Sequence, residues 1–211
     1  MPDRAARQRH WDEAYTGRGV QDVSWFQAVP QMSLELLECL EVRTTASVLD
    51  VGAGASCLVD TLLDRGFDDL TVLDVSEVAL HAVRDRLPAG APVTLVRHDL
   101  LTWQPARRFD VWHDRAVLHF LVDEEDRRSY RRVLDSALAP EGAVVIATFA
   151  PDGPETCSGL PVSRYDADGL AALLGPAFAV VAVRHEEHVT PAGVVQPFTW
   201  VAARAVPAAA R

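Results

Sequence analysis

Two carboxylates that follow a glycine-rich turn could bind the sugar and the base of a nucleoside. Asp50 is followed by Gly52 and Gly54 in a turn between an apolar run and an amphipathic stretch, and glycines suit such a turn because they let the backbone bend sharply and a ligand approach closely. Asp74 follows 24 residues after Asp50, near the spacing at which dinucleotide-binding folds place the acid that accepts ribose hydroxyls. Asp99, after the next apolar run, could accept a hydrogen bond from an adenine amino group. This pattern predicts a nucleoside site.

A second group of reactive side chains lies between residues 113 and 119. His113 could act as a general base because the unperturbed pKa of histidine lies near neutrality, and His119 is a second candidate. The alternative for each histidine is a packing role in the core or in a loop. Arg115 could bind a substrate carboxylate through two donors of its guanidinium group, or it could pair with a neighbouring acid such as Asp114 or Asp123. We therefore expect catalytic and substrate-binding groups in this segment.

Short apolar runs alternate with amphipathic stretches, and these elements would hold the reactive groups in place. The apolar runs predict strands at 47–51, 70–73, 93–96, 109–112, 143–149, 178–184 and 194–203. The amphipathic stretches predict helices at 58–65, 78–87, 124–138 and 166–174. This alternation implies a parallel sheet with helices on both faces, in which ligands bind at the carboxyl ends of the strands. No long helix separates the last two strands, so we expect an antiparallel hairpin at one edge.

The order and spacing of these motifs resemble the class I S-adenosylmethionine-dependent methyltransferases. The matching segments are 48–54 (VLDVGAG), 73–76 (LDVS), 98–100 (HDL), 109–114 (FDVWHD) and 138–142 (LAPEG), which together cover about residues 46–149. Two positions depart from the family pattern: Ser56 stands where a third glycine is usual, and Glu141 stands where a Pro-Gly-Gly turn has its first glycine. Loss of the third glycine would harm a pyrophosphate site more than a site for a cofactor without phosphate, which favours adenosylmethionine over NAD.

The resemblance implies a Rossmann-like three-layer α/β sandwich with a seven-stranded, mostly parallel sheet and a C-terminal antiparallel hairpin. It also implies S-adenosylmethionine as the cofactor, with Asp50 near its methionine moiety, Asp74 on its ribose and Asp99 at its adenine. Asp114, like His113, would lie beside the transferring methyl group. The cofactor contacts expected in this core are Asp50, Gly52, Ala53, Gly54, Asp74, Val75, Asp99, Leu100 and His113.

Four aromatic residues precede the predicted core, namely Trp11, Tyr15, Trp25 and Phe26. In many class I methyltransferases such a segment closes over the cofactor. We therefore expect a lid that excludes water, with Trp11 and Tyr15 against the cofactor and Trp25 and Phe26 against the substrate. The alternative is the packing of an N-terminal helix on the edge of the sheet.

The loop after the fifth predicted strand is expected on the substrate side of the sheet. Arg164 and Tyr165 could reach an anionic substrate, and Cys157 could contact a soft substrate or be a small buried residue. His185 and His188 are close together in the sequence, but on a strand they would point to opposite faces. We therefore expect no metal site.

The composition indicates one folded, acidic domain. The 211 residues are 49% hydrophobic and 24% charged, with a formal net charge of −10. We divide residues 1–211 into an N-terminal lid or helical segment at 1–40, a cofactor-binding core at 46–149, and a substrate loop with a hairpin at 150–205. The acidic balance disfavours nucleic acid and anionic membranes as partners, and no apolar stretch is long enough to span a membrane. Three scattered cysteines and the lack of a signal sequence predict a cytoplasmic location.

These expectations combine into a small-molecule methyltransferase that uses S-adenosylmethionine. The acceptor atom stays open, because a thiol or heavier chalcogen, an amine, a hydroxyl and a carboxylate all fit the pattern. One alternative is a protein lysine methyltransferase, in which Asp114, Asp123, Glu124 and Glu125 would attract a basic peptide. A further alternative is an NAD-dependent oxidoreductase or a non-catalytic nucleotide-binding module. The sequence does not predict an oligomeric state.

Overall fold

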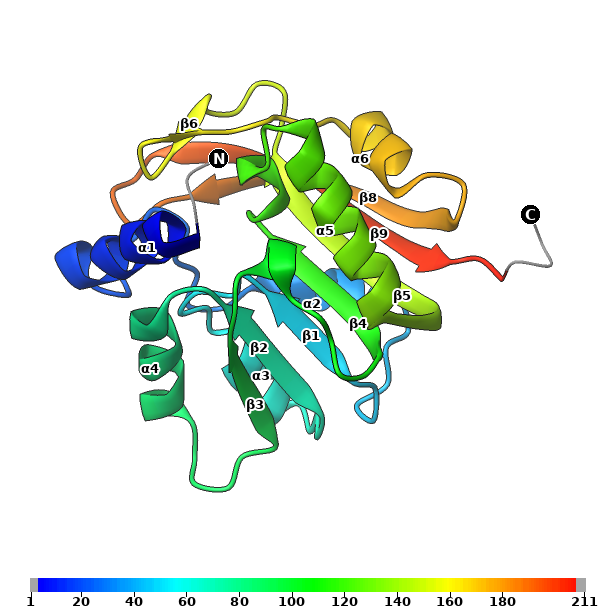
Figure 1. The fold of residues 1–211 in the computed structure, drawn as a ribbon, viewed down its shortest axis with the longest axis horizontal. Helices are drawn as coiled ribbons and strands as arrows, with labels where there is room; N and C mark the ends of the chain where they lie inside the picture. The colour runs from blue at the N-terminus through cyan, green and yellow to red at the C-terminus, as the bar shows by residue number, and fades with distance from the viewer. Residues whose placement is uncertain (1–3, 208–211) are drawn as a thin grey trace.

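A seven-stranded sheet forms the centre of the structure, which is a computed structural model that describes residues 4–207 (Figure 1). The strand order is β3-β2-β1-β4-β5-β9-β8. Strands β1 to β5 run parallel to one another, whereas β9 is antiparallel to both β5 and β8. The strands of this sheet are β1 Val48–Val51, β2 Leu70–Asp74, β3 Val93–Arg97, β4 Phe109–Arg115, β5 Leu138–Phe149, β8 Phe178–Val189 and β9 Val195–Ala205.

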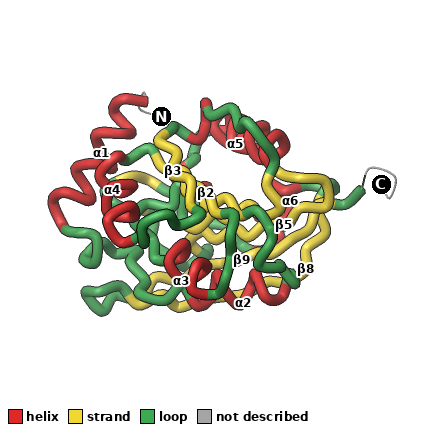
Figure 2. The backbone as a smooth tube through the Cα atoms, turned by 90° about the horizontal axis from the view of Figure 1, so that it is seen from below, coloured by secondary structure: helices red, strands yellow, loops and turns green. Residues whose placement is uncertain are grey.

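Helices cover both faces of the sheet, which gives the three layers that the sequence predicts. Residues of α2, α3 and α4 share a buried core with one face, and residues of α5 and α6 share a core with the other. Figure 2 shows α5 on one side of the strands and α2 and α3 on the other. Successive residues along a strand point to opposite faces of the sheet, so Val48 packs in one core and Leu49 in the other. The helices are α1 Arg4–Arg18, α2 Gln31–Cys39, α3 Leu58–Asp64, α4 Glu77–Arg86, α5 Glu124–Ala137 and α6 Ala167–Leu174.

Several elements differ from the expected boundaries, among them β4, which continues beyond residue 112 to Arg115. β5 begins at Leu138, directly after α5, and the predicted turn at 140–142 lies within this strand as an irregularity where Glu141 has a φ of 62°. The hairpin strands β8 and β9 are longer than expected. The loop at 151–165 contains a small two-stranded sheet of β6 Thr156–Cys157 and β7 Leu160–Pro161. Each difference lies where polar or proline residues interrupt the apolar pattern from which strands are predicted.

Side-chain caps start the helical turns that follow β2 and β3. The Ser76 hydroxyl accepts a hydrogen bond from the backbone N–H of Ala79 at 3.1 Å and begins α4. The Asp99 carboxylate accepts from the backbone N–H of Leu101 at 3.0 Å and begins the short 3-10 helix Leu100–Thr102. Such caps satisfy backbone donors that have no partner inside the helix. They bring the chain sharply away from the carboxyl ends of the strands and leave space there.

Candidate active site

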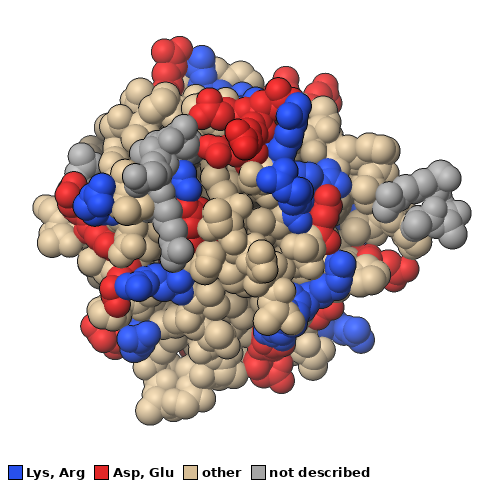
Figure 3. Space-filling view, in the orientation of Figure 1, with Lys and Arg blue, Asp and Glu red and all other residues tan. Residues whose placement is uncertain are grey.

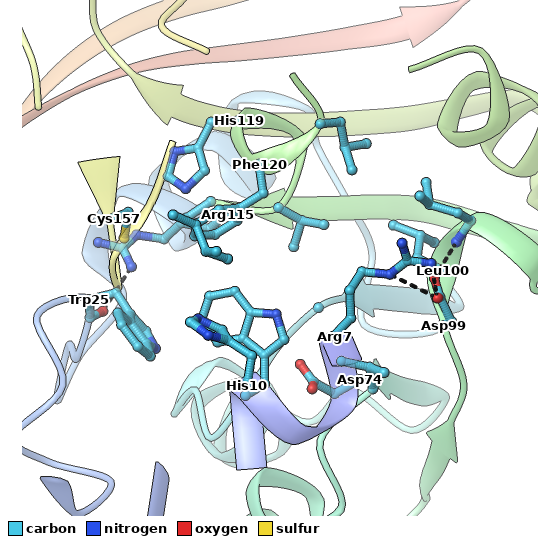
Figure 4. A pocket seen from close by; sticks show the side chains of 18 of the residues that line it. Arg7, His10, Trp25, Asp74, Asp99, Leu100, Arg115, His119, Phe120 and Cys157 are labelled. Atoms are coloured by element: carbon cyan, nitrogen blue, oxygen red, sulfur yellow. Dashed lines mark hydrogen bonds and ion pairs between the residues drawn. The ribbon is translucent and has the colours of Figure 1, made fainter. Parts of the chain in front are cut away.

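The carboxyl ends of the parallel strands border a cavity of about 310 Å³. Gly52 follows β1, Asp74 ends β2, Asp99 follows β3 and Arg115 ends β4, and all four line this cavity. Helix α1 forms a further wall, and Figure 4 shows these side chains around the open space. The volume lies at the lower end of the range for small-molecule sites. The site is therefore at the edge of the sheet where the sequence predicts it.

Asp74 is a buried carboxylate that holds the turn after β1 and the start of α4. It accepts hydrogen bonds from the backbone N–H groups of Gly54 and Ser76, each at 2.7 Å. Burial raises the pKa of Asp74 from 3.8 to about 6, although the two backbone donors oppose the rise and the charge of Asp50 adds to it. Since the carboxylate also lines the cavity, its remaining lone pairs can accept hydroxyl groups such as those of a ribose.

Asp99 forms an ion pair with a residue of α1 that the sequence predictions omitted. Arg7 donates from Nε to Oδ2 of Asp99 at 3.0 Å, and Nη2 makes a second contact with the same oxygen. Leu100, the neighbour of Asp99, also lines the cavity. Arg7, Trp11 and Tyr15 are spaced four residues apart and therefore share one face of α1. That spacing is the sequence signal that could have identified Arg7.

The glycine-rich turn leaves no room for side chains at its two glycines. Gly52 and Gly54 have φ values of 55° and 57°, a region that favours glycine. A Cβ at Gly52 would lie 2.1 Å from Cγ2 of Val117, and one at Gly54 would lie 1.9 Å from Oη of Tyr15. Gly52 lines the cavity directly, whereas Gly54 is covered by Tyr15. Both glycines are therefore required by close packing as well as by backbone conformation.

His113 lies away from the main cavity, with both ring nitrogens engaged. Nδ1 lies 2.7 Å from Oδ1 of Asp50, and Nε2 lies 2.9 Å from the Ser33 hydroxyl. All three residues are buried and line a smaller cavity of about 50 Å³ together with Ala53. A general base needs a nitrogen that faces the substrate, and neither nitrogen of His113 does so here. The geometry gives His113 a structural role that links β1, β4 and α2.

Asp114 faces the opposite core and is also fully engaged. Its carboxylate accepts hydrogen bonds from the Tyr130 hydroxyl at 2.7 Å and from the backbone N–H groups of Val117 and Leu118 at 2.9 Å and 3.2 Å. Burial raises its pKa from 3.8 to about 6, against the lowering effect of these donors. Asp114 does not line the main cavity. The prediction that it lies beside the reacting group therefore finds no support in the geometry.

Arg115 and His119 do line the main cavity; His119 is buried and Arg115 is half-buried. Arg115 donates from Nη1 to the carbonyl oxygen of Trp25 at 2.9 Å, and its guanidinium carbon lies 4.8 Å from the ring centre of Phe198. Burial and the charge of Arg115 lower the pKa of His119 to about 3. A histidine with that pKa is neutral at pH 7 and is a weak base. His119 can therefore offer a hydrogen bond, but it is poorly suited to remove a proton.

Aromatic rings from α1 and the following loop pack together over the cavity. The ring of Trp11 lies 5.8 Å from that of Trp25 and 5.0 Å from that of Phe120, and Trp25 donates from Nε1 to the Tyr15 hydroxyl at 3.1 Å. Trp11, Tyr15 and Trp25 all line the cavity, as their positions in the sequence predict for a lid. Phe26 borders only the smaller cavity. Three of the four expected aromatics, together with Phe120, therefore line the main cavity.

The three residues expected from the late loop have different surroundings. Cys157 is buried and lines the main cavity next to the β6–β7 turn. Arg164 instead donates to the Gly153 carbonyl oxygen and pairs with Glu155, both at 3.1 Å. Tyr165 packs beside the core shared by α5 and α6. Neither Arg164 nor Tyr165 borders either cavity.

Comparisons of sequence identify relatives among methyltransferases. Residues 48–142 match the sequence profile of a methyltransferase domain family. The chain is 28% identical over 140 residues to the eEF1A lysine and N-terminal methyltransferase of Mus musculus, a match that covers 64% of this chain and 19% of that protein. It is 24% identical over 163 residues to EEF1A lysine methyltransferase 2 of Danio rerio, with 70% of each protein covered. The chain thus spans about a fifth of the length of the mouse relative.

A solved structure has the same fold over nearly the whole chain. The 1,6-didemethyltoxoflavin-N1-methyltransferase of Burkholderia thailandensis, with bound 1,6-didemethyltoxoflavin and S-adenosylhomocysteine, aligns with a TM-score of 0.73 at 22% identity. The alignment covers 98% of this chain and 91% of that one. The profile match covers β1 to β4, whose carboxyl ends border the cavity, and the sheet order and final hairpin agree with the expected architecture. Residues 48–142 are therefore those of a methyltransferase domain, and the chain has the fold of the class I S-adenosylmethionine-dependent methyltransferases.

Proposed function

We propose that this protein transfers a methyl group from S-adenosylmethionine to a small-molecule acceptor. The observation that carries the proposal is one cavity with two chemically different sides. Asp74 and Asp99 lie on one side, and Arg115 and His119 lie on the other (Figure 4). Carboxylates suit the hydroxyl and amino donors of adenosine, and the remaining side offers donors to a second ligand.

The residues around Asp74 fit the nucleoside part of the cofactor. In this assignment Asp74 accepts the ribose hydroxyls, and Asp99 with Leu100 borders the adenine. Gly52 and Val75 line the same wall and leave space because the first has no side chain and the second is small. When bound, S-adenosylmethionine supplies a methyl group on a positively charged sulfur. The buried acids of this wall would also stabilise that positive charge.

Catalysis would rest on positioning and on exclusion of water. Trp11, Trp25 and Phe120 form an apolar wall, which keeps solvent from an acceptor held in line with the methyl group. His113 is bonded on both nitrogens and His119 is held neutral. An acceptor that is nucleophilic without removal of a proton, such as a thiolate or a neutral amine, would therefore suit this site.

Calorimetric titration followed by a methyl-transfer screen tests the proposed function. We expect S-adenosylhomocysteine to bind and NAD to produce no heat, whereas binding of NAD alone would favour the oxidoreductase alternative. The screen would measure transfer of radiolabelled methyl from S-adenosylmethionine to thiols, amines, carboxylic acids and basic peptides. Transfer to a small acceptor supports the proposal. Binding of the cofactor with transfer to peptides alone would replace it with the second candidate.

A protein lysine methyltransferase is the second candidate, and two observations favour it. The curated relatives from mouse and zebrafish are named as eEF1A lysine methyltransferases. In addition, Glu124, Glu125 and Asp126 open α5, three residues beyond Leu121 of the cavity wall, and Figure 3 shows acidic side chains gathered over this end of α5. This acidic turn could attract a basic peptide. The positive charge of Arg115 argues against a protein lysine methyltransferase, because it would repel a lysine side chain inside the cavity.

A further inference from the structure

One side of the main cavity presents three hydrogen-bond donors without acceptors. Among the described residues, Nε and Nη2 of Arg115 and Nε2 of His119 are buried and have no hydrogen-bond partner. Both side chains line the cavity, and Figure 4 shows them on the side away from Asp74 and Asp99. Unsatisfied buried polar groups are rare and costly in native proteins. These three atoms therefore mark a place where a ligand would complete the structure.

The chemistry of the three atoms is that of donors. A guanidinium group carries only donors. The backbone N–H of Phe149 donates to Nδ1 of His119 at 3.4 Å, so a neutral ring carries its proton on Nε2. A group with acceptors only, such as an oxyanion, is the natural partner for this arrangement.

The acids near Arg115 do not pair with it directly, although the charges of Glu186 and Asp50 favour its positive charge. Glu186 accepts hydrogen bonds from Gln27 at 2.8 Å and from Trp200 at 2.9 Å. Asp50 is bonded to His113. In the described part of the chain no carboxylate lies within ion-pair distance of Arg115. The rings of Phe149 and Phe198 surround the site, and such an apolar setting strengthens a charge-assisted hydrogen bond.

We propose that Arg115 and His119 form a binding site for the carboxylate, or an equivalent oxyanion, of a molecule held in the main cavity. This inference rests on the proposed function, since two carboxylates could then reach the site. One is the amino-acid carboxylate of the cofactor, because Arg115 also borders the smaller cavity beside Gly52. The other is an acid group on the methyl acceptor, because His119 borders the main cavity and not the smaller one.

The test compares ligands that differ only in the carboxylate. S-adenosylhomocysteine and 5′-methylthioadenosine share the nucleoside but only the first carries an amino-acid carboxylate. Benzoate and benzamide, titrated into protein saturated with S-adenosylhomocysteine, form the matching pair for the acceptor. Calorimetry would measure each ligand with the wild type, with Arg115→Met and with His119→Phe. Arg164→Met is the control, because Arg164 pairs with Glu155 outside both cavities.

The outcomes separate the two sources of the carboxylate. If the cofactor supplies the carboxylate, Arg115→Met lowers the affinity for S-adenosylhomocysteine at least tenfold and leaves the affinity for 5′-methylthioadenosine unchanged. If the acceptor supplies it, benzoate binds at least tenfold more tightly than benzamide, and both site variants abolish this preference. Unchanged affinities in both variants, with no preference for benzoate, would overturn the inference. If Arg115→Met does not fold, the affinities of His119→Phe and of the wild type for the same ligand pairs still test the inference. Failure of 5′-methylthioadenosine to bind the wild type would instead contradict the proposed nucleoside site.

Discussion

Asp74 shows how one side chain can shape the backbone and present a ligand site together. Its two oxygens accept the backbone N–H groups of Gly54 and Ser76, so it joins the turn after β1 to the start of α4. The same carboxylate faces the cavity. Each carboxylate oxygen can accept more than one hydrogen bond. Asp74 therefore contributes to folding and, in the proposed function, to cofactor binding.

Substitution of Asp74 should affect both properties. Asp74→Ala leaves two backbone donors without partners, which should lower the free energy of unfolding by about 2 kcal/mol or more. We expect the variant to bind S-adenosylhomocysteine about 1–3 kcal/mol more weakly, because hydrogen bonds to a charged acceptor are lost. Urea denaturation and calorimetry measure the two effects. Asp69→Ala is the control, since Asp69 pairs with Arg107 at the surface, and unchanged cofactor affinity in Asp74→Ala would remove Asp74 from the site.

His113 should act on stability rather than on proton transfer. His113→Phe leaves the buried groups of Asp50 and Ser33 without their partner, so we expect a loss of about 2–4 kcal/mol in the free energy of unfolding. The dependence of the methyl-transfer rate on pH should keep its shape, because the histidine does not face the cavity. Denaturation and a pH–rate profile with an acceptor from the screen measure these effects. A stable variant that loses an ionisation from its pH–rate profile would restore the general-base prediction.

At the scale of elements, α1 is the part of the site that depends most on contacts distant in sequence. Arg7 pairs with Asp99, and Tyr15 lies against Gly54. The helix is polar along most of its length, and the contacts of its inner face hold it over the sheet. Isolated helices of this length are marginally stable in water. The seating of α1 should therefore be sensitive to small changes in the glycine-rich turn.

Gly54→Ala tests this dependence. The new Cβ would lie 1.9 Å from the Tyr15 hydroxyl, so we expect α1 to be displaced, S-adenosylhomocysteine to bind at least tenfold more weakly, and trypsin to cut α1 faster. Adding Tyr15→Phe removes the clashing oxygen and should restore part of the affinity. Gly90→Ala is a matched control, because Gly90 also has a positive φ, 76°, but its Cβ would meet nothing within 4 Å. Equal losses in Gly54→Ala and Gly90→Ala would show that backbone strain alone is responsible.

For the whole molecule, the net charge of −10 conceals buried acids that oppose folding when they are charged. Asp74 and Asp114 both have pKa values raised to about 6 by burial. His119 has the opposite behaviour, since its pKa is lowered to about 3. The response of the fold to pH is therefore a sum of opposing contributions, and the contribution of a single group must be isolated by comparison with a variant.

No helix between residues 4 and 207 has the length and apolar character needed to cross a membrane.

The difference between the wild type and Asp114→Asn isolates Asp114. The folded protein holds the Asp114 proton more tightly than the unfolded chain, so this group adds stability below pH 4 and loses that contribution as pH rises through 6. We expect the free energy of unfolding of the wild type, relative to Asp114→Asn, to increase by about 2 kcal/mol as pH falls from 7.5 to 4. Urea denaturation at several pH values measures it. A difference that does not vary with pH would mean that burial leaves the pKa of Asp114 near 3.8.

The sequence predicted most strands and helices because apolar runs indicate buried strands and amphipathic stretches indicate helices that cover them. It missed the ends of β8 and the small β6–β7 sheet. The last residues of β8 are mostly polar and alternate between exposed and more buried positions at the sheet edge. A search for hydrophobic runs therefore does not find them. The prediction that Trp11, Tyr15 and Trp25 lie near the cofactor site came from the family resemblance, and all three line the cavity. The pairing of Arg7 with Asp99 spans 92 residues, and no local pattern indicates such a contact.

By itself the sequence determined the order of elements, the glycine-rich turn and the three acids at or near the carboxyl ends of the first three strands, because these follow from local spacing. Only the tertiary structure decided which of His113, Asp114 and Arg115 faces the cavity. The register of β1 and β4 sets His113 beside Asp50, the alternation of the strand turns Asp114 to the other core, and Arg115 at the strand end reaches the cavity. A shift of one residue would exchange these roles, and strand register depends on contacts between distant segments.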